Sequence, residues 1–240
     1  MTTRQKQLLA AIIHEFIETA NAVGSVSLYD KYKFNVSPAT IRNEMAALVR
    51  EGYLDKPHSS AGRVPTTLGL RMFIEEMMED LEELDVLTKT QVRQQFHHAR
   101  FNKDSLIREA LSTLTKVAHN PTIALVGTEI YYAGLSDMLD IPEFQELDNL
   151  KRLLAMLEDY AKLSKLFNHG RADQDVKVLI GEETEAEEFR DYAIVFAELR
   201  LHGDQHGYIA VIGPNRMPYQ KIIPAVDYVA KTISNVVSGW

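Results

Sequence analysis

The 240-residue chain contains no cysteine, so it can form neither a disulfide framework nor a thiolate metal site. It also contains no apolar run that approaches the ~18 residues needed to cross a membrane. Its first residues are polar and carry no signal peptide. Together, these absences favour a protein of the reducing cytoplasm.

The usual sequence motifs of catalysis are missing as well. We find no nucleophile elbow, no phosphate-binding glycine loop and no metal-ligand cluster. His97 and His98 are adjacent, so on a helix they lie on different faces, and no thiol or acidic residue is spaced to complete a metal site. The segment 213–216 could hold a small anion, although a strand-to-helix turn is the simpler interpretation. We therefore expect no enzyme activity, no metal and no other cofactor.

What the chain does contain is an uneven distribution of charge. With 45% hydrophobic and 25% charged residues, it has the composition of an ordinary globular protein. The net charge of −8 by itself argues against a nucleic-acid partner. Residues 1–75 nevertheless hold nine Lys and Arg against seven Asp and Glu, a net charge of +2, which leaves −10 for the rest. A mildly basic head on an acidic body is expected when only the head meets phosphate.

The most informative stretch is residues 36–54. Ser37 is a good N-cap, and Pro38 suits the first helical position because its missing N–H costs nothing there. Gly52 suits a left-handed residue just beyond the C-terminus of a helix. The stretch therefore predicts a helix from Pro38 to Glu51. Its apolar stripe consists of Ile41, Met45, Leu48 and Val49.

The opposite face of this helix carries small or hydrogen-bonding side chains in its N-terminal half: Ala39, Thr40, Arg42, Asn43 and Ala46. A helix that enters the major groove needs such a slim polar end. Arg can bond guanine, Asn can bond adenine, and a Thr methyl can pack on thymine. An amphipathic surface helix with incidental polar residues is the alternative, and it is the better one for this helix in isolation. The flanking segments favour a recognition helix.

Those flanks predict a helix-turn-helix followed by a hairpin. We expect a helix over residues 3–20 and a short one from Ser25 to Tyr32, with Val26, Leu28 and Tyr29 pointing inward. After the recognition helix, two extended pieces at 53–55 and 63–65 flank a polar loop, which predicts a hairpin, or wing. A surface loop that closes a small domain is the alternative. A further helix is expected from Thr66 or Thr67 through Leu84.

This arrangement predicts which residues face DNA. From the recognition helix we expect contacts by Ser37, Thr40, Arg42 and Asn43, with Arg42 and Asn43 contacting bases. From the wing we expect phosphate or minor-groove contacts by Lys56, His58, Ser60 and Arg63.

The rest of the chain predicts an α+β body. Helices are expected from Asp104 or Ser105, over 144–167 and over 219–237, and an acidic turn over 182–188. Strands are expected at 122–126, 130–132, 176–180, 192–201 and 207–212. The fold class is α+β, with a winged-helix domain over residues 1–84, a helical linker over 85–103 and an α+β domain over 104–240.

Two long segments carry a family resemblance. Residues 36–54 and 57–66 closely resemble the winged-helix domain of the HrcA family of heat-inducible transcription repressors, and residues 213–228 resemble its C-terminal part. A weaker match covers residues 132–144. The resemblance implies a GAF-like sensor and dimerisation domain and a homodimer on an inverted-repeat operator called CIRCE, upstream of chaperone genes. It also implies a GroEL-type chaperonin that keeps the repressor active.

The chain departs from the family pattern between Val126 and Tyr132, which are almost adjacent here. Family members carry further strands and an inserted dimerising subdomain at this point. We therefore expect a reduced body that lacks this insertion. A shortened paralogue that controls other genes, without chaperonin input, is the alternative function.

Overall fold

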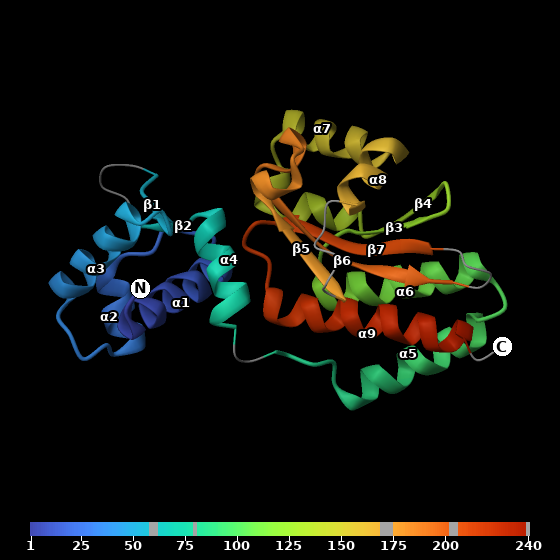
Figure 1. Cartoon of the computed structure of the whole chain (residues 1–240), viewed down its shortest axis with the longest axis horizontal. Helices are drawn as coiled ribbons and strands as arrows, with labels where there is room; N and C mark the ends of the chain where they lie inside the picture. The colour runs from blue at the N-terminus through green and yellow to red at the C-terminus, as the bar shows by residue number, and fades with distance from the viewer. Residues whose placement is uncertain (58–61, 79–80, 169–174, 202–205, 239–240) are drawn as a thin grey trace. The chain divides into compact units, whose positions relative to one another are not determined.

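The computed structural model describes residues 1–57, 62–78, 81–168, 175–201 and 206–238 (Figure 1). They form two compact units, residues 1–79 and 80–240, called the head and the body below. The α+β class is confirmed, because helices accompany an antiparallel sheet. Among the residues just given, no helix is long and apolar enough to span a membrane.

The head begins with three helices whose ends are set by local capping. They are α1 (Thr3–Thr19), α2 (Ser25–Tyr32) and α3 (Pro38–Arg50). The Thr2 side chain caps α1, and Ser37 Oγ caps α3 by accepting a hydrogen bond from the Thr40 amide at 3.2 Å. The helices pack around one apolar core formed by Leu8, Leu9, Ile12, Ile13, Leu28, Ile41, Met45 and Leu48. The helix predicted from Pro38 to Glu51 is thus confirmed to within one residue at its C-terminus.

A short hairpin follows α3, as the sequence predicts. It consists of β1 (Leu54–Asp55) and β2 (Val64–Pro65), and it leads into α4 (Thr67–Glu76). The amide and carbonyl of Arg63 bond those of Val23 at 2.9 and 2.8 Å, which ties the hairpin to the turn between α1 and α2. Gly62 allows this approach, because a Cβ there would lie 2.4 Å from the Val23 carbonyl oxygen. The base of the hairpin is therefore rigidly attached to the helices.

Two expectations for the head are wrong. Val26 and Tyr29 are 61% and 41% exposed instead of pointing inward, because α2 has only eight residues and buries Leu28 alone. The helix expected to run to Leu84 ends at Glu76. A new helix, α5 (Val86–Ala99), starts instead, with Asp85 Oδ1 accepting a hydrogen bond from the Thr88 amide at 2.9 Å.

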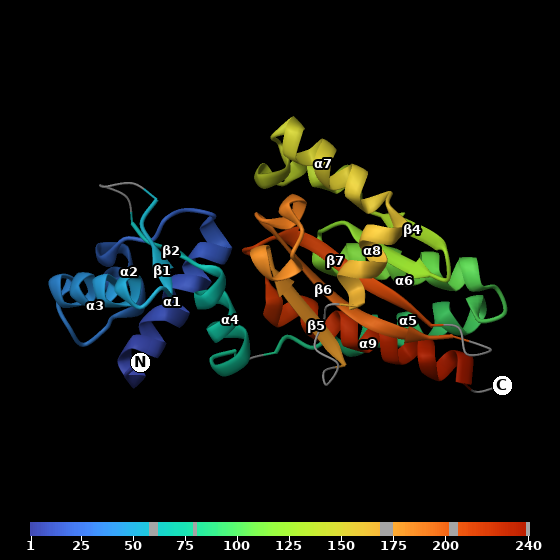
Figure 2. The same ribbon diagram turned by 45° about the horizontal axis from the view of Figure 1, so that its top comes forward.

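The body is built on a five-stranded antiparallel sheet in the order β4-β3-β7-β6-β5. The strands are β3 (Thr122–Val126), β4 (Glu129–Ala133), β5 (Val176–Ile180), β6 (Tyr192–Arg200) and β7 (His206–Pro214). Helices α6 (Lys103–Ala118) and α9 (Tyr219–Ser238) cover one face, and α7 (Leu147–Leu157) and α8 (Tyr160–Asn168) cover the other (Figures 1 and 2). Alternate residues of the central strands are buried toward each layer, which explains their nearly continuous apolar sequences.

Two helix boundaries in the body differ from the sequence prediction. The helix expected over 144–167 is two helices, because Asp159 Oδ1 accepts a hydrogen bond from the Lys162 amide at 3.1 Å and so starts a new one. Phe144 belongs to a short 3-10 turn before them. Helix α6 is capped by Asn102, whose Oδ1 accepts from the Ser105 amide at 2.9 Å, and not by Asp104 or Ser105.

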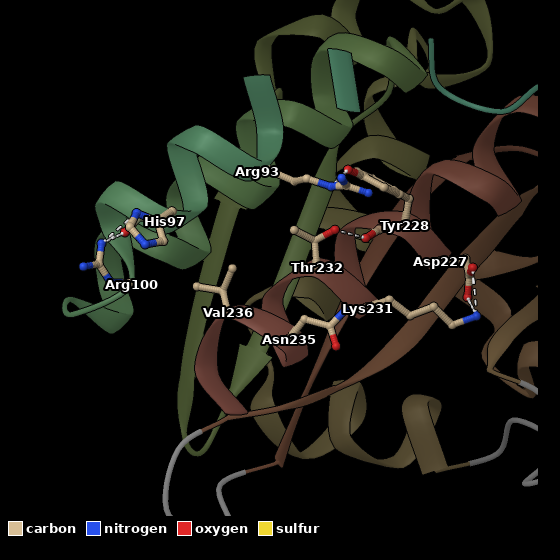
Figure 3. Close-up of a pocket in the computed structure, with 9 residues that line it drawn as sticks. All are labelled: Arg93, His97, Arg100, Asp227, Tyr228, Lys231, Thr232, Asn235 and Val236. Atoms are coloured by element: carbon tan, nitrogen blue, oxygen red, sulfur yellow. Dashed lines mark hydrogen bonds and ion pairs between the residues drawn. The ribbon is translucent and has the colours of Figure 1, made fainter. Parts of the chain in front are cut away.

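The segment expected as a linker, residues 85–103, contains α5, and this helix packs on α6 and α9 within the body. Val92 and Phe96 are buried in that contact. Two hydrogen bonds attach α5 to α9: Arg93 Nε donates to Tyr228 Oη at 3.0 Å, and that hydroxyl donates to the Lys89 carbonyl at 3.0 Å. Arg93 and Tyr228 are drawn in Figure 3. Only two residues of α5 enter the core, which is why its sequence shows no strong apolar period.

Candidate nucleic-acid interface

Helix α3 presents a polar face because its apolar face is fully used in the head core. Ile41, Met45 and Leu48 are buried, so the residues on the opposite side point outward. Arg42 and Asn43 are exposed, and neither side chain makes a hydrogen bond or ion pair with another residue that the structure describes. Their planar donor groups are therefore available to a ligand.

Ser37 and Thr40 lie at the N-terminus of the same helix and interact with each other. Their hydroxyl oxygens are 3.0 Å apart, and Ser37 Oγ is the N-cap. Pro38 has no N–H, and the amides of Thr40 and Ile41 bond Ser37, so the Ala39 amide is the one left without an intrahelical partner in this turn, at the positive end of the helix dipole. This end of α3 therefore combines two hydroxyls, one free amide and partial positive charge, which suits a phosphate oxygen.

The hairpin residues predicted to touch DNA have different environments. Lys56 is exposed at the end of β1, where its amide donates to Asp55 Oδ1 at 2.7 Å. Arg63 is half-buried at the base of the hairpin, and its Nη1 donates to the Gly62 carbonyl at 3.1 Å. His58 and Ser60 lie outside the described residues. Lys56 is thus the better placed of the two for a contact with solvent or DNA.

Several acidic residues of the head form ion pairs within it. Glu44 on α3 accepts a hydrogen bond from Arg4 Nε at 2.6 Å, and Glu76 is 2.6 Å from Lys6 Nζ. Lys31 Nζ lies 2.7 Å from Glu15 and 2.6 Å from Glu18. The hydrogen bond from Lys31 lowers the pKa of Glu18, and the two carboxylates together raise the pKa of Lys31.

The basic residues near α3 and the hairpin differ in this respect. In the described part of the head, no acidic side chain pairs with Lys33, Arg42, Arg50 or Lys56. Over residues 1–79 the charges cancel, nine basic against nine acidic. These four cations are therefore available to a ligand, although the exposed carboxylates of Glu51 and Asp55 nearby also make no ion pair that the structure describes.

Lys33 is a candidate that the sequence analysis passed over. It lies in the turn between α2 and α3, in the left-handed conformation with φ of 46°. Tyr29 on α2 is also exposed, although it was expected in the core. The sequence could have indicated Lys33 as a candidate DNA contact. It lies in the turn of the helix-turn-helix, and this turn runs beside the helix that enters the groove.

The body contains an open groove between α5 and α9, with a volume of about 640 Å³ (Figure 3). Its main cations already have partners: Lys231 Nζ is 2.7 Å from Asp227 and 3.1 Å from Asp175, and Arg93 bonds Tyr228. The hydrogen bond with Asp227 is the main cause that raises the pKa of Lys231. The groove offers no nucleophile and base in contact, so it suggests no chemistry.

The head is a helix-turn-helix with a hairpin behind its second helix, and the chain continues into an α+β body. This arrangement defines a transcription regulator of the winged-helix type. The family model described as "HrcA protein C terminal domain" matches residues 69–223. The chain belongs to the HrcA family.

Similar proteins extend over the whole chain. It is 27% identical to the heat-inducible transcription repressor HrcA of Pelotomaculum thermopropionicum, over 334 aligned positions that cover 98% of this chain and 96% of the relative. It is also 27% identical to the same repressor of Carboxydothermus hydrogenoformans, with 98% of each chain covered. A crystal structure of a hypothetical protein shares the fold, with a TM-score of 0.82 at 18% identity over 100% of this chain and 99% of that one. The chain is accordingly a transcription repressor and not an enzyme.

Proposed function

We propose that the chain represses heat-shock (chaperone) genes in the cytoplasm by binding an inverted-repeat operator of the CIRCE type as a homodimer. The head binds the duplex, and the body is a reduced GAF-like domain for sensing and dimerisation. One observation carries the proposal: the N-terminal half of α3 is exposed and polar, and the one acidic residue on α3, Glu44, is held by Arg4. Such a surface fits the major groove better than it fits another protein surface.

In this proposal, α3 provides sequence specificity. Arg42 and Asn43 contact base edges, while Ser37 and Thr40 contact the backbone at the helix N-terminus. Lys56, His58, Ser60 and Arg63 belong to the hairpin contacts, and Lys33 adds a phosphate contact. One helix contacts only a few base pairs, which is too few against a genome of competing sites. Two heads on a two-fold axis, with recognition helices ~34 Å apart, contact a palindrome instead.

The control of the repressor follows from the family resemblance. A GroEL-type chaperonin keeps the dimer in its active fold, and heat diverts the chaperonin to other unfolded proteins. The repressor then loses its active fold and chaperone genes are transcribed. The names of the relatives, which are heat-inducible repressors, support this direction of control.

The direct test is a binding titration with three DNA duplexes of equal length: an inverted repeat, the same duplex with one half-site scrambled, and random DNA. We expect tight binding of two chains to the inverted repeat, with added GroEL raising the active fraction of protein. Equal affinity for all three duplexes at moderate salt would disprove a sequence-specific repressor.

A shortened paralogue that controls another set of genes is the second candidate. The alignment with the Pelotomaculum relative needs 334 positions although this chain has 240 residues. In addition, Val126 pairs with Glu129, so that Gly127 and Thr128 alone join β3 to β4. Genome-wide footprinting before and after heat shock distinguishes the two candidates. Occupied promoters without any chaperone operon, unaffected by heat, would favour the paralogue.

A further inference from the structure

The groove between α5 and α9 is lined mostly by polar side chains, which Figure 3 shows on the two neighbouring helices. On each helix they recur at intervals of four and three: Arg93, His97 and Arg100 on α5, and Tyr228, Thr232 and Asn235 on α9. Residues at these intervals lie on one face of a helix. Two helices that pack together usually present apolar faces to each other. The volume of the groove, about 640 Å³, is typical of a small-molecule site.

Arg93 provides a positive charge that is held in place but not neutralised. Its Nε donates to Tyr228 Oη at 3.0 Å, and this hydroxyl donates in turn to the Lys89 carbonyl at 3.0 Å. A phenol is a neutral partner, so it orients the guanidinium without cancelling its charge. Among the residues that the structure describes, no carboxylate pairs with Arg93. Its two terminal nitrogens therefore remain available, and they match two oxygens of a carboxylate or phosphate.

His97 adds a second hydrogen-bond donor on the same side of the groove. Arg100 Nη1 lies 2.9 Å from His97 Nδ1. Because an arginine N–H can only donate, Nδ1 accepts this bond and the neutral ring carries its proton on Nε2. Arg100 also brings a second guanidinium to the groove. The α5 side therefore offers donors and positive charge together.

The balance of charge around the groove favours a ligand with one acidic group. Lys231 Nζ lies 2.7 Å from Asp227 and 3.1 Å from Asp175. Together with Arg93 and Arg100, this makes three cations against two carboxylates, an excess of one positive charge. The body as a whole has 17 basic and 25 acidic side chains, a net charge of −8, so the groove differs from its surroundings. A polyphosphate or a DNA strand would bring further phosphates close to Asp227 and Asp175.

The α9 side of the groove suits the uncharged part of such a ligand. Thr232 is only 7% exposed, and its hydroxyl donates to the Tyr228 carbonyl at 2.7 Å, so the hydroxyl oxygen can still accept a hydrogen bond. The amide of Asn235 can both donate and accept, and Val236 adds an apolar surface. A short carbon skeleton with hydroxyl groups fits these neighbours.

We propose that the groove between α5 and α9 binds a small organic anion, a carboxylate or a monophosphate, whose oxygens contact the terminal nitrogens of Arg93 and Nε2 of His97. All the residues that line the groove belong to the body. The inference therefore goes beyond the proposed function, because the site needs neither DNA nor a second chain. A ligand held by both helices binds the folded body only, so it should also raise the melting temperature of the body.

An NMR titration of the full chain tests the site directly. The probes are benzoate and phenyl phosphate, with benzamide and phenol as neutral counterparts of similar shape. We expect saturable shifts of the Arg93 Nε–H signal, which an Arg93→Lys variant assigns, and affinities about tenfold higher for the anions than for the neutral compounds. Comparison of the two anions shows whether the site prefers carboxylate or phosphate.

Three results of this titration would overturn the proposal. The first is the absence of a saturable shift with either anion. The second is equal affinity for benzoate and benzamide, since the contact would then not depend on charge. The third is tighter binding of ATP or of duplex DNA than of phenyl phosphate at the same signal, which would assign the groove to a polyanion.

Two variants should change the affinity for phenyl phosphate in opposite directions. Arg93→Gln should lower it by about tenfold, because a charge-assisted pair of hydrogen bonds is lost. Arg108→Gln is the matched control, an exposed arginine on α6 outside the groove, and should bind as the unmodified chain does. Asp227→Asn removes a carboxylate and leaves Asp175 to pair with Lys231, so it should raise the affinity by about threefold.

The gain expected for Asp227→Asn matters because a variant that fails to fold cannot bind more tightly. An unchanged affinity in Arg93→Gln, or an unchanged or lower affinity in Asp227→Asn, would overturn the proposed contacts. The proposed function is judged separately. A chain that binds the inverted repeat but neither anion disproves the groove site alone. A chain that binds the anions but no inverted repeat disproves the proposed function alone.

Discussion

The head and the body both carry lysines, arginines and carboxylates, but they differ in which of these side chains form ion pairs. In the body, lysines at the surface pair with nearby carboxylates, as Lys162 does with Glu188 at 2.9 Å and Lys231 with Asp227 at 2.7 Å. In the head, Arg4, Lys6 and Lys31 form such pairs, while Arg42 and Arg50 on α3 and Lys56 just after β1 contact no acidic side chain that the structure describes.

This difference shows how a protein with a net charge of −8 can still present a face for DNA. The basic face does not come from an excess of cations in the head, where the charges of residues 1–79 cancel. What the structure shows is that Glu44, the one carboxylate within α3, is paired with Arg4, and a paired carboxylate repels phosphate less.

The largest effect on stability should come from replacing a buried isoleucine by alanine, once in the core of the head and once in the core of the body. Ile12 in the head and Ile194 in the body are both fully buried. Replacing either by Ala should lower the free energy of unfolding of its own unit by ~2–5 kcal/mol, through lost contacts and the remaining cavity. Circular dichroism melts, with half-site binding at each temperature, measure both effects.

Ile12→Ala should abolish half-site binding at a temperature where Ile194→Ala leaves it intact. The two variants are controls for each other, because the removed atoms and the burial are the same. Loss of half-site binding in both would mean that head and body unfold as one cooperative unit.

The next effect concerns base contacts by α3. Arg42→Ala should lower operator affinity by ~1–3 kcal/mol and relax base preference, because a two-bond contact to guanine is lost. Fluorescence anisotropy with operator and random DNA measures this. Arg50→Ala is the matched control, an exposed arginine at the other end of the same helix, and should have a small effect. Equal losses on operator and random DNA would assign Arg42 to the phosphates.

Lys56 should contribute less and without sequence preference. Lys56→Ala should weaken binding to operator and random DNA alike, and lower the slope of log affinity against log salt by ~1, since one fewer counterion is released. Titrations at several salt concentrations give the slope. An unchanged slope would remove Lys56 from the phosphate contacts.

The parts that were predictable from sequence are those fixed by neighbours in the chain. Helix α3 follows from Ser37, Pro38 and Gly52, and Gly52 indeed has a φ of 82°. The exposure of Arg42 and Asn43 follows from the apolar stripe on the other side of that helix. Whether these two residues contact bases stays a prediction, because no DNA is present.

The parts that failed depend on residues far away in the chain. Helix α5 was expected to be a linker because its place in the body depends on Tyr228, which is 135 residues from Arg93. Likewise, Glu44 on the recognition helix gave no sign that Arg4, forty residues earlier, neutralises it. Local capping and periodicity carry no information about such partners.

The smallest effect should come from an ion pair of the body. The hydrogen bond from Lys162 lowers the pKa of Glu188 below the ordinary value of 4.5. A carboxyl whose pKa is lowered in the folded state stabilises the protein above its unfolded pKa, and this stabilisation is lost as the pH falls through the folded pKa. Because the pair is largely exposed to solvent, its contribution to stability at neutral pH should be small.

Glu188→Gln should therefore lower the melting temperature of the body slightly at pH 7, by an amount that shrinks as the pH falls through the lowered pKa of the unmodified carboxyl. Glu187→Gln is the control, because the neighbouring carboxylate makes no ion pair that the structure describes. Half-site binding at pH 7 should be unchanged in both variants, since the pair belongs to the body. A difference between the two melts that grows toward acid pH would contradict the assigned sign. A loss of half-site binding would show that ion pairs of the body influence the DNA-binding face.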